Sequence, residues 1–390
     1  MEGEPPGEPL GHGSDGASPS NLGITPAKQP TMSFALGKLA LASNLFLAPL
    51  AGYTNLPFRL VIREIGGVGL CTTDLVNARS LIDRNRGAHK LVETCPADSP
   101  LSVQLFGKEP AELRDAAVIL ESRGIPIVDV NMGCPVHKVC RNGGGSALLT
   151  DHAKAVRLVK AMVDAVKIPV TCKMRLGWDA DNLTAPDLAR ALEDVGVAGI
   201  IIHGRTRQQG FTGTVNLDGI RAVVQAVKTI PVIGNGDITT PRIAKRMFDE
   251  TGCAAISIGR GAFYNPWIFR HTAHFLATGE ELPEPTLNER LAVMTKHLDR
   301  MVEVFGEAQG CRQFRKVSLQ YSRRFGPVNY FDKRMVQLNS RSEFDEIVAA
   351  YRHWRLPFLD ENGELKQAYK PRSLDHPLAI QVREGPNELW

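Results

Sequence analysis

Hydrophobic and polar positions follow two alternating patterns along most of this chain. Short apolar runs alternate with longer segments in which apolar residues recur at helical spacing, and this alternation repeats eight times between residues 39 and 280. Eight β/α units in about 240 residues fit a closed (β/α)8 TIM barrel of the α/β class. The predicted strands are Leu45–Leu47, Val68–Thr72, Leu101–Leu105, Ile127–Val130, Val170–Lys173, Gly199–Ile202, Val232–Gly234 and Ala255–Ile258.

Residues able to bind a ligand or take part in chemistry stand at the end of nearly every predicted strand. In chain order they are Ala48 with Pro49, Thr73 with Asp74, Gln104, Asn131 with Cys134, Lys173 with Arg175, His203 with Arg205, Asn235 with Asp237, and Gly259 with Arg260. A doubly wound open sheet is the alternative fold, but it would not direct all of these residues to one ligand. A closed barrel does so, because the carboxyl ends of its strands meet at one mouth.

The segments on either side of the barrel pattern differ from it in composition. Residues 1–38 are rich in Gly, Pro, Ser and carboxylates, so we expect a disordered tail. After a proline-rich joint, residues 285–352 regain helical periodicity and predict an all-helical C-terminal domain, whose first helix Thr286 or Asn288 could cap. Residues 353–390 are polar and contain proline, which predicts an extended C-terminal tail.

Composition narrows the cellular setting. No apolar run approaches the roughly 20 residues that span a bilayer, so we expect no membrane association. The N-terminus has neither the apolar stretch of a secretory signal nor the arginines of a transit peptide, which makes the cytoplasm the expected location. The seven cysteines form no Cys-x-x-Cys pair, and this argues against a disulfide framework or a metal site.

The net charge of +4 says little about partners, but the charges are unevenly distributed. Residues 310–335 contain seven cations and one anion, with five aromatic residues between them. This pattern suits an RNA backbone and its bases, although a solvated helix face above ordinary core aromatics would look the same. The candidate RNA-binding residues are Arg312, Arg315, Lys316, Arg323 and Arg324.

The candidate catalytic residue lies in the stretch Asp129–Leu149. An apolar strand leads into this stretch, so Asn131 and Cys134 are expected at the barrel mouth, and the glycines at 143–145 let the backbone approach a flat ligand closely. A structural turn with a buried thiol is the alternative interpretation. A thiol with a pKa of about 8.5 is mostly protonated near neutral pH, so Cys134 could give a proton to a carbon beside one that receives a hydride. Cys140, in the same loop, is expected only to pack.

Two glycine-containing turns follow the last two predicted strands, at Asn235–Asp237 and Gly259–Gly261. Barrels often bind phosphate at these two places, and Arg260 would add charge-assisted hydrogen bonds. Either turn alone could be a simple chain reversal. The pair in the correct strands indicates a bound nucleotide such as FMN.

Three residues at intervening strand ends suit the ring of such a cofactor. Lys173 and Gln104 match the polar pyrimidine edge of an isoalloxazine, where a cation stabilises the negative charge that forms on reduction. His203 could hydrogen-bond the flavin or a substrate carbonyl, with a satisfied interior histidine as the alternative.

Six motifs occur in order along the chain: Leu47–Arg59, Asp129–Val139, Lys173–Trp178, His203–Thr206, Gly234–Ile238, and Ile258–Ala262 followed by Asn265–Phe269. Together they resemble the tRNA-dihydrouridine synthases, and most closely their bacterial B-type subgroup. The resemblance runs from about residue 40 to 335 and leaves both tails uncovered. It implies an FMN-binding barrel, a helical tRNA-binding domain and NADPH as the reductant.

The resemblance also implies roles for individual residues. Cys134 would protonate C5 of the uracil ring, and Asn131 and Arg205 would contact the substrate. The implied cofactor-binding residues are Ala48, Pro49, Leu50, Gln104, Lys173, His203, Asn235, Gly236, Asp237, Gly259 and Arg260.

The sequence therefore predicts reduction of the C5=C6 bond of specific uridines in tRNA to dihydrouridine. Two departures from the family pattern stand out: the Arg-Lys-His signature of the helical domain appears as Arg315–Val317, and Tyr53 and Asn55 replace the more usual Val or Met and Asp. A dihydroorotate- or dihydropyrimidine-type flavoenzyme acting on a free pyrimidine is one alternative. A non-catalytic RNA-binding protein is the other.

Overall fold

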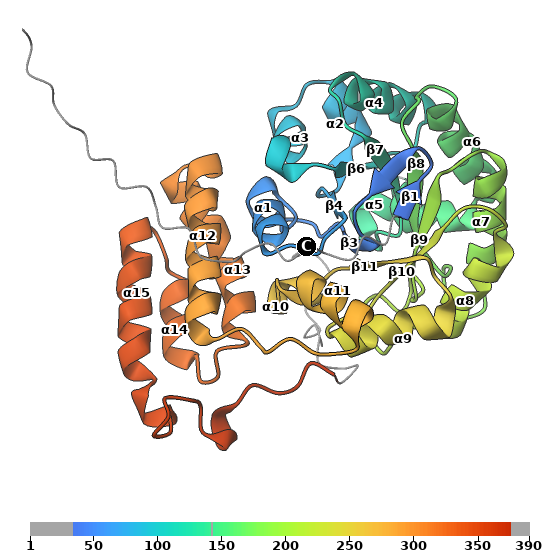
Figure 1. Ribbon diagram of the computed structural model, residues 1–390. Helices are drawn as coiled ribbons and strands as arrows, with labels where there is room; N and C mark the ends of the chain where they lie inside the picture. The colour runs from blue at the N-terminus through green and yellow to red at the C-terminus, as the bar shows by residue number, and fades with distance from the viewer. Residues whose placement is uncertain (1–33, 142, 376–390) are drawn as a thin grey trace, which may run out of the picture.

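The computed structural model describes residues 34–141 and 143–375. The predicted N-terminal tail therefore lies outside the described residues up to residue 33, and the predicted C-terminal tail does so from residue 376. The described chain forms a barrel surrounded by helices, with a second group of helices packed against one side of it (Figure 1).

Within the described residues, eight parallel strands close into a barrel. Seven strand pairings follow the order β4-β3-β11-β10-β9-β8-β7-β6. An eighth pairing, of β4 with β6 at Cys71 and Leu101, closes the ring. Each predicted strand overlaps one of these, so the predicted (β/α)8 barrel is confirmed and the open sheet is excluded. The strands are β3 (Leu45–Leu47), β4 (Leu70–Thr72), β6 (Leu101–Phe106), β7 (Ile127–Met132), β8 (Val170–Arg175), β9 (Gly199–His203), β10 (Val232–Asn235) and β11 (Ala255–Ile258), with β5 (Val76–Asn77) as a short extra strand on β6.

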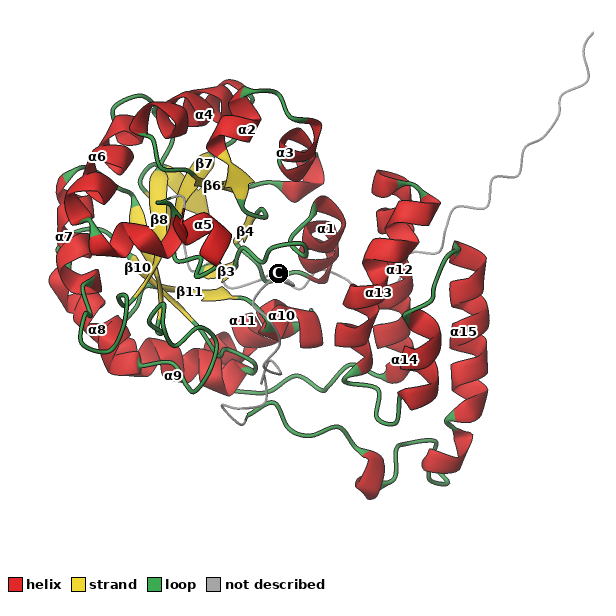
Figure 2. Ribbon diagram, turned by 180° about the vertical axis from the view of Figure 1, so that it is seen from behind, coloured by secondary structure: helices red, strands yellow, loops and turns green. Residues whose placement is uncertain are grey.

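Helices cover the outside of the barrel (Figure 2). Several begin at a side chain that accepts a backbone N–H: Asn55 accepts from Phe58, and Asp151 accepts from Lys154. Their apolar faces pack on the outward side chains of the strands in one continuous core. The helices are α1 (Leu56–Ile65), α2 (Ala78–Ile82), α3 (Arg86–Leu91), α4 (Pro110–Ser122), α5 (His137–Arg141), α6 (His152–Val163), α7 (Ala185–Asp194), α8 (Leu217–Ala226), α9 (Pro241–Thr251), α10 (Gly261–Tyr264) and α11 (Ile268–Thr278).

The inside of the barrel changes from apolar to polar along its axis. Its amino-terminal end is closed by an antiparallel hairpin of β1 (Phe34–Leu36) and β2 (Leu39–Leu41), so residues 34–38 belong to this hairpin rather than to the predicted tail. Leu36 and Leu41 of the hairpin pack on inward apolar side chains such as Ile201. Higher up, the inward residues are buried polar groups: Ser102, Gln104, Asp129, Asn131, Thr171, His203, Asn235 and Ser257. The polar end is the mouth that holds the candidate site.

A helical region follows the barrel. It consists of α12 (Leu287–Phe305), α13 (Glu307–Ser322), α14 (Asn329–Met335) and α15 (Arg341–Trp354) around an apolar core of its own. Thr286 caps α12 in a capping box with Glu289, as one of the two predicted caps.

The helical region packs on the barrel beside the mouth. Helix α1 contacts α12, and α10 contacts α13. The ring of Phe58 stacks on His297 with 5.5 Å between ring centroids. Glu64 pairs with Lys296 at 2.5 Å and also with Arg300. The helical region therefore stands directly beside α1 and α10 of the barrel (Figures 1 and 2).

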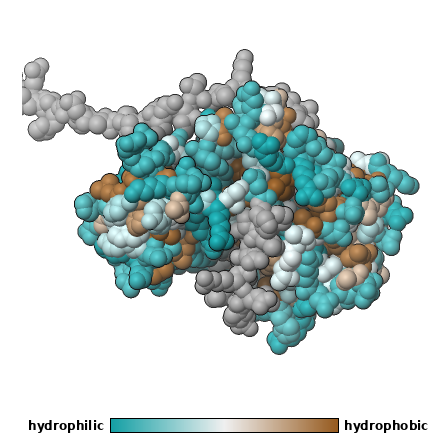
Figure 3. Space-filling model, turned by 90° about the horizontal axis from the view of Figure 1, so that it is seen from below, coloured by the Kyte–Doolittle hydropathy of each residue, from teal (hydrophilic) through white to brown (hydrophobic). Residues whose placement is uncertain are grey.

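The segment after α15 returns to the barrel. It contains the short 3-10 turns Leu356–Phe358 and Gln367–Tyr369, and the hydroxyl of Thr239 donates to the carbonyl of Leu374 at 2.6 Å. The space-filling view shows a mostly hydrophilic surface with separate hydrophobic patches (Figure 3). Among the described residues, no helix is both long enough and apolar enough to cross a bilayer.

Candidate active site

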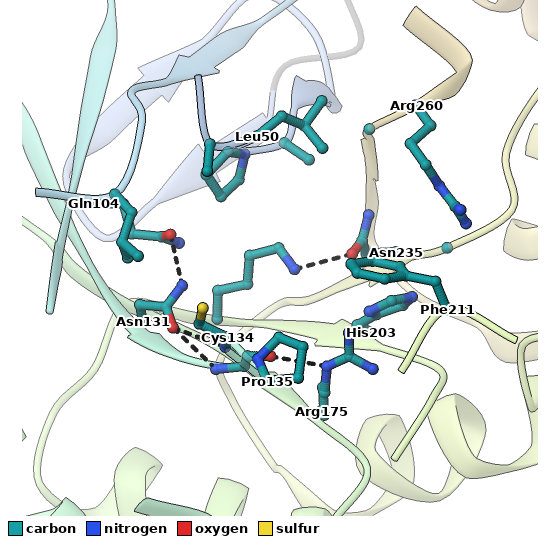
Figure 4. Close-up of a pocket in the computed structure, with 18 of the residues that line it drawn as sticks. Leu50, Gln104, Asn131, Cys134, Pro135, Arg175, His203, Phe211, Asn235 and Arg260 are labelled. Carbon is teal, nitrogen blue, oxygen red and sulfur yellow. Dashed lines mark hydrogen bonds between the residues drawn. The ribbon is translucent and has the colours of Figure 1, made fainter. Parts of the chain in front are cut away.

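A cavity of about 340 Å³ opens at the polar end of the barrel, a size typical of small-molecule sites. It gathers the predicted catalytic residue, one of the two predicted substrate contacts and every predicted cofactor-binding residue. Figure 4 shows Gln104 and Asn131 on one side of it, with Cys134 next to Asn131, and Arg260 and Phe211 on the other side. The predicted residues that line it are Ala48, Pro49, Leu50, Gln104, Asn131, Cys134, Lys173, His203, Asn235, Gly236, Asp237, Gly259 and Arg260.

Cys134 is held in the cavity by the loop that follows β7. Its backbone N–H donates to Asn131 Oδ1 at 2.9 Å, and its carbonyl accepts from the hydroxyl of Ser146 at 2.8 Å. Burial raises the pKa of the Cys134 thiol, while the positive charges of Arg175 and Lys173 act in the opposite direction. The thiol therefore keeps its proton near neutral pH. Once the proton is transferred, the positive charges of Arg175 and Lys173 would stabilise the thiolate.

Lys173 reaches from β8 across the inside of the mouth. Its ammonium donates to Asn235 Oδ1 at 3.0 Å, and Asn235 in turn donates to the carbonyl of Ser257 at 2.6 Å. Burial is the main cause that lowers the pKa of Lys173 to about 8, and repulsion by Arg175 adds to it. A bound anion would favour the charged lysine and restore its pKa.

His203 is neutral in this site. Burial lowers its pKa well below the ordinary 6.5, and the charge of Arg175 lowers it further. The guanidinium of Arg205 lies 3.3 Å from His203 Nε2. An arginine can only donate, so Nε2 accepts and the ring proton sits on Nδ1.

The turn after β10 brings a glycine and a carboxylate to the cavity wall. Gly236 has φ +126°, and a Cβ there would lie 2.3 Å from Val215 Cγ1. Asp237 pairs with Arg205 at 2.7 Å and with Arg260 at 3.5 Å. The carboxylate therefore holds Arg260 beside the turn, where the sequence predicts a phosphate site.

Arg205 was predicted to contact the substrate, but its side chain lies behind the cavity wall and does not line the cavity. Its guanidinium donates to the carbonyls of Thr212 at 3.1 Å and Gly213 at 2.6 Å, besides its ion pair with Asp237. The side chain is 1% exposed. The position of Arg205 is that of a residue that holds the loop after β9 in place.

The sequence placed Arg175 at the barrel mouth without giving it a role, and it missed Phe211 altogether. Arg175 donates to the carbonyls of Gly133 at 2.8 Å and Gly210 at 2.7 Å, so it ties the cysteine loop to the loop after β9. Phe211 lies between Arg175 and Arg260, whose guanidinium carbons are 5.2 and 5.1 Å from its ring centroid. Arg175 stands two residues after the inward Lys173 on the same strand, so both side chains point to the same side. Nothing in the sequence near Phe211 indicates where its loop folds.

Three of the five predicted RNA-binding residues lie on α13 or directly after its last residue, with side chains exposed to solvent. Lys316 Nζ lies 4.5 Å from the ring centroid of Tyr53, and Arg323 lies 5.1 Å from that of Tyr264. Arg312 is exposed one turn before Lys316. We call Arg312, Lys316 and Arg323 the α13 basic stripe.

The other two predicted RNA-binding residues are engaged within the protein. Arg315 donates to the carbonyl of Leu338 at 2.9 Å and to Asn339 Oδ1 at 2.8 Å. Arg324 donates to the carbonyl of Arg372 at 2.8 Å, and its side chain is 12% exposed. Arg315 therefore holds the segment that follows α14, and Arg324 holds the C-terminal segment.

In the part of the chain that the structure describes, no three His, Cys, Asp or Glu side chains come together in a way that could hold a metal ion. The polar side chains of the mouth are mostly amides and cations, with one thiol, one neutral imidazole and one carboxylate, and this set suits an organic ligand with carbonyl and anionic groups.

Comparison with known proteins matches residues 46–353 to the dihydrouridine synthase (Dus) family model. The chain is 40% identical over 281 residues to tRNA-dihydrouridine synthase B of Xanthomonas axonopodis pv. citri, covering 72% of this chain and 84% of that protein. The same coverage and identity relate it to tRNA-dihydrouridine synthase B of Pseudomonas aeruginosa. A probable tRNA-dihydrouridine synthase of Rickettsia prowazekii is 40% identical over 291 residues, with 74% and 88% coverage.

Among solved structures, the old yellow enzyme of Trypanosoma cruzi has a TM-score of 0.45 at 11% identity and covers 66% of this chain and 94% of its own. That likeness is too low to carry an argument. The match to the family model over most of the chain and the identity to its B-type members are decisive, and this chain belongs to the dihydrouridine synthase family, in the B-type subgroup.

Proposed function

We propose that this protein reduces the C5=C6 bond of specific uridines in tRNA, with FMN at the barrel mouth, NADPH as the reductant and Cys134 as the proton donor. The observation that carries the proposal is the position of the Cys134 thiol, which lines the cavity together with the amides of Gln104 and Asn131 and with buried cations. Burial raises the pKa of this thiol, which favours its protonated form. The names of the B-type relatives supply the substrate class.

The residues of the mouth fit FMN. Ala48, Pro49 and Leu50 give the cavity an apolar wall of the kind a flat ring needs. The absence of a Cβ at Gly236 lets the backbone pass close to Val215, and Arg260 beside that turn suits a phosphate. When bound, FMN would supply the hydride that C6 of the uracil ring receives.

The chain itself supplies the proton and the orientation. The Cys134 thiol would give its proton to C5, and the resulting thiolate would be stabilised by Lys173 and Arg175. Asn131 would contact the edge of the uracil ring from beside the thiol, because its amide lies on the wall next to Cys134.

The α13 basic stripe gives tRNA a place to dock next to the cavity. Lys316 and Arg323 lie over aromatic rings of the barrel rim, so phosphates bound there would be held within reach of the mouth. A target uridine inside a folded tRNA must leave its stack to enter the cavity. We include Lys316, Arg323 and Arg312 in the proposed RNA surface and leave Arg315 and Arg324 out, because both are engaged internally.

The test is nucleoside mass spectrometry of unmodified tRNA after incubation with the protein, FMN and NADPH. Cys134→Ala should lower dihydrouridine formation by about a hundredfold or more, because a general acid contributes that much to a proton transfer. The same variant should still oxidise NADPH, since that reaction does not use the thiol.

Cys140→Ala is the matched control. Cys140 lies in the same loop, and its Sγ contacts the carbonyl of Cys134 at 3.3 Å. That variant should keep near-normal activity.

A Cys134→Ala protein that forms dihydrouridine at the normal rate would refute the assignment of the proton donor. Turnover of free uracil or orotate without turnover of tRNA would replace the proposal by a free-pyrimidine reductase, and a colourless protein that binds tRNA without reducing it would replace it by an RNA-binding protein.

A further inference from the structure

Among the described residues, four cations line the cavity, and three of them are already bound within the chain. Lys173 donates to an amide oxygen, Arg175 donates to backbone carbonyls, and Arg260 pairs with a carboxylate. The fourth is Lys138, whose ammonium makes no hydrogen bond and no ion pair with any other described residue. This cation is therefore available to an anionic ligand.

Lys138 belongs to the short helix α5, which packs directly beside the proposed proton donor. Cys140 of the same helix contacts the carbonyl of Cys134 through its Sγ at 3.3 Å. A Cβ at Gly145 would lie 2.9 Å from Val139 Cγ1 and 3.3 Å from Cys134 Cβ, so the chain around these residues is closely packed. Helix α5 is thereby fixed next to the thiol, and Lys138 with it.

The side chain of Lys138 both lines the cavity and is exposed to solvent. Pro135, Val136 and Val139 form an apolar stretch of cavity wall around it. A lysine in such surroundings lays its methylene groups along the apolar wall and keeps its ammonium in water. The positive charge of Lys138 therefore stands at the opening of the cavity rather than at its base.

The predicted phosphate site of FMN lies away from this helix. It consists of the turn after β10 and Arg260, and Figure 4 shows Arg260 on the opposite side of the cavity from Asn131, which has Cys134 next to it. FMN would use Arg260 for its phosphate, which leaves Lys138 to a different anion.

The proposed substrate carries anions at the place where Lys138 stands. A uracil ring must lie against Cys134 to receive its proton at C5. The cavity of about 340 Å³ admits the extruded nucleotide but not the polynucleotide, so the phosphates on either side of that nucleotide stay at the opening. Lys138 follows Cys134 by four residues, and its ammonium is at the same opening.

We infer that Lys138 binds a backbone phosphate next to the target uridine. The charge-assisted hydrogen bond from its ammonium would hold the extruded nucleotide in the cavity and make a uridine within an RNA chain a better substrate than a free base. The inference rests on the proposed function and adds the group that recognises the RNA backbone at the cavity itself, apart from the α13 basic stripe.

The experiment removes the charge of one phosphate at a time. A tRNA joined from synthetic pieces carries a single uncharged methylphosphonate linkage, on either the 5′ or the 3′ side of the mapped target uridine. Its binding to the FMN-loaded, oxidised protein is measured without NADPH, so that no turnover occurs. At one of the two linkages the methylphosphonate should weaken binding to the wild-type protein at least about tenfold, because a hydrogen bond between charged groups is lost.

The same loss should appear once, and only once, when the lysine is removed. Lys138→Ala should bind the all-phosphate tRNA at least about tenfold more weakly than wild type. The methylphosphonate should then cost Lys138→Ala less than about twofold, because the two partners of one contact are not additive. In turnover, this variant should show a raised KM for tRNA, with its FMN content and its KM for NADPH unchanged.

Two further variants separate this contact from general attraction to RNA. Arg141→Ala removes an exposed cation from the same helix that does not line the cavity, so it should bind within about twofold of wild type and keep the methylphosphonate effect. Lys138→Arg keeps the charge and a donor, so it should restore most of the affinity and the sensitivity to the linkage.

The outcomes are distinct. The inference is overturned if neither linkage matters to the wild-type protein, or if Lys138→Ala senses the methylphosphonate as strongly as wild type. It is also overturned if Lys138→Ala loses FMN or raises only the KM for NADPH, because the lysine would then hold a phosphate of the cofactor or the reductant. These results leave the proposed function standing. A wild-type protein that forms no dihydrouridine in any tRNA would overturn the proposed function, and this inference with it.

Discussion

Replacing Lys173 by methionine should make the protein without cofactor more stable while weakening its hold on FMN. The pKa of Lys173 falls from 10.5 to about 8, mainly because its ammonium is buried. At about 1.4 kcal/mol for each pH unit, the charged lysine costs the fold up to about 3 kcal/mol at pH 7. Methionine has a similar length without the charge, but it leaves Asn235 Oδ1 without its 3.0 Å donor, which costs about 1 kcal/mol. The expected net gain is about 2 kcal/mol.

The gain should depend on pH in a predictable direction. Below pH 8 the lysine is charged in both the folded and the unfolded state, so its full cost is present. Between pH 8 and 10.5 the folded protein loses the proton first and the cost disappears. The stability advantage of Lys173→Met should therefore be largest at about pH 6 to 7 and small near about pH 10. The same variant should bind FMN at least about tenfold more weakly, because a charge-assisted contact has been removed.

Urea unfolding of the cofactor-free protein between about pH 6 and 10 and a titration with FMN measure both effects. Lys160→Met is the matched control: Lys160 lies on α6, is 56% exposed and pairs with Asp164 at 2.8 Å. Its removal should change the free energy of unfolding by no more than about 0.5 kcal/mol at any pH. The reasoning fails if Lys173→Met is less stable than wild type at neutral pH, or if its advantage stays constant into the alkaline range.

Two further predictions concern the phosphate turn and the RNA surface. Gly236→Ala should weaken FMN binding by more than about tenfold, because the new Cβ would lie 2.3 Å from Val215 Cγ1 in a backbone conformation that alanine rarely adopts. Gly279→Ala is its control, since Gly279 also has a positive φ of +77° but no atom within 4 Å of the new Cβ, and equal FMN affinity in both variants would contradict the steric argument. Lys316→Ala and Arg323→Ala should each reduce the slope of log affinity for tRNA against log salt by about 1 without changing FMN binding. Lys245→Ala on α9 should leave that slope unchanged, and a loss of affinity that does not depend on salt would argue against phosphate contacts by the stripe.

The barrel could be predicted from the sequence because parallel strands covered by helices are buried on both faces. Such strands read as apolar runs, and all eight runs became strands. The hairpin of β1 and β2 was missed because each strand has only three residues, too few to show the alternation of a strand, and Gly37 and Lys38 interrupt the apolar run. What makes the hairpin fold is the apolar end of the barrel, which no local pattern reveals.

The sequence predicted most of the residues that line the candidate site, but not the hydrogen bonds and ion pairs between them. Strand ends converge on one mouth in any barrel, so Gln104, Lys173 and Asn235 were expected there. Whether a given strand-end side chain faces the cavity or is bound by the surrounding chain depends on how the loops fold, which no local pattern reveals. Arg205 illustrates this, because the loop after β9 folds back over its guanidinium and takes it away from the cavity.

The charge distribution around the cavity explains why a protein would keep residues that lower its own stability there. Four cations line the mouth against one carboxylate: Lys138, Lys173, Arg175 and Arg260 face Asp237. Burial, with repulsion by neighbouring cations, lowers the pKa of Lys173 to about 8 and that of Arg175 to about 10. Each lowered pKa measures a free-energy cost that a bound anion offsets, so ligand binding and folding are coupled. The buried cations lower the stability of the barrel but already stand where an anionic ligand requires them, and preorganisation of this kind is what an active site needs.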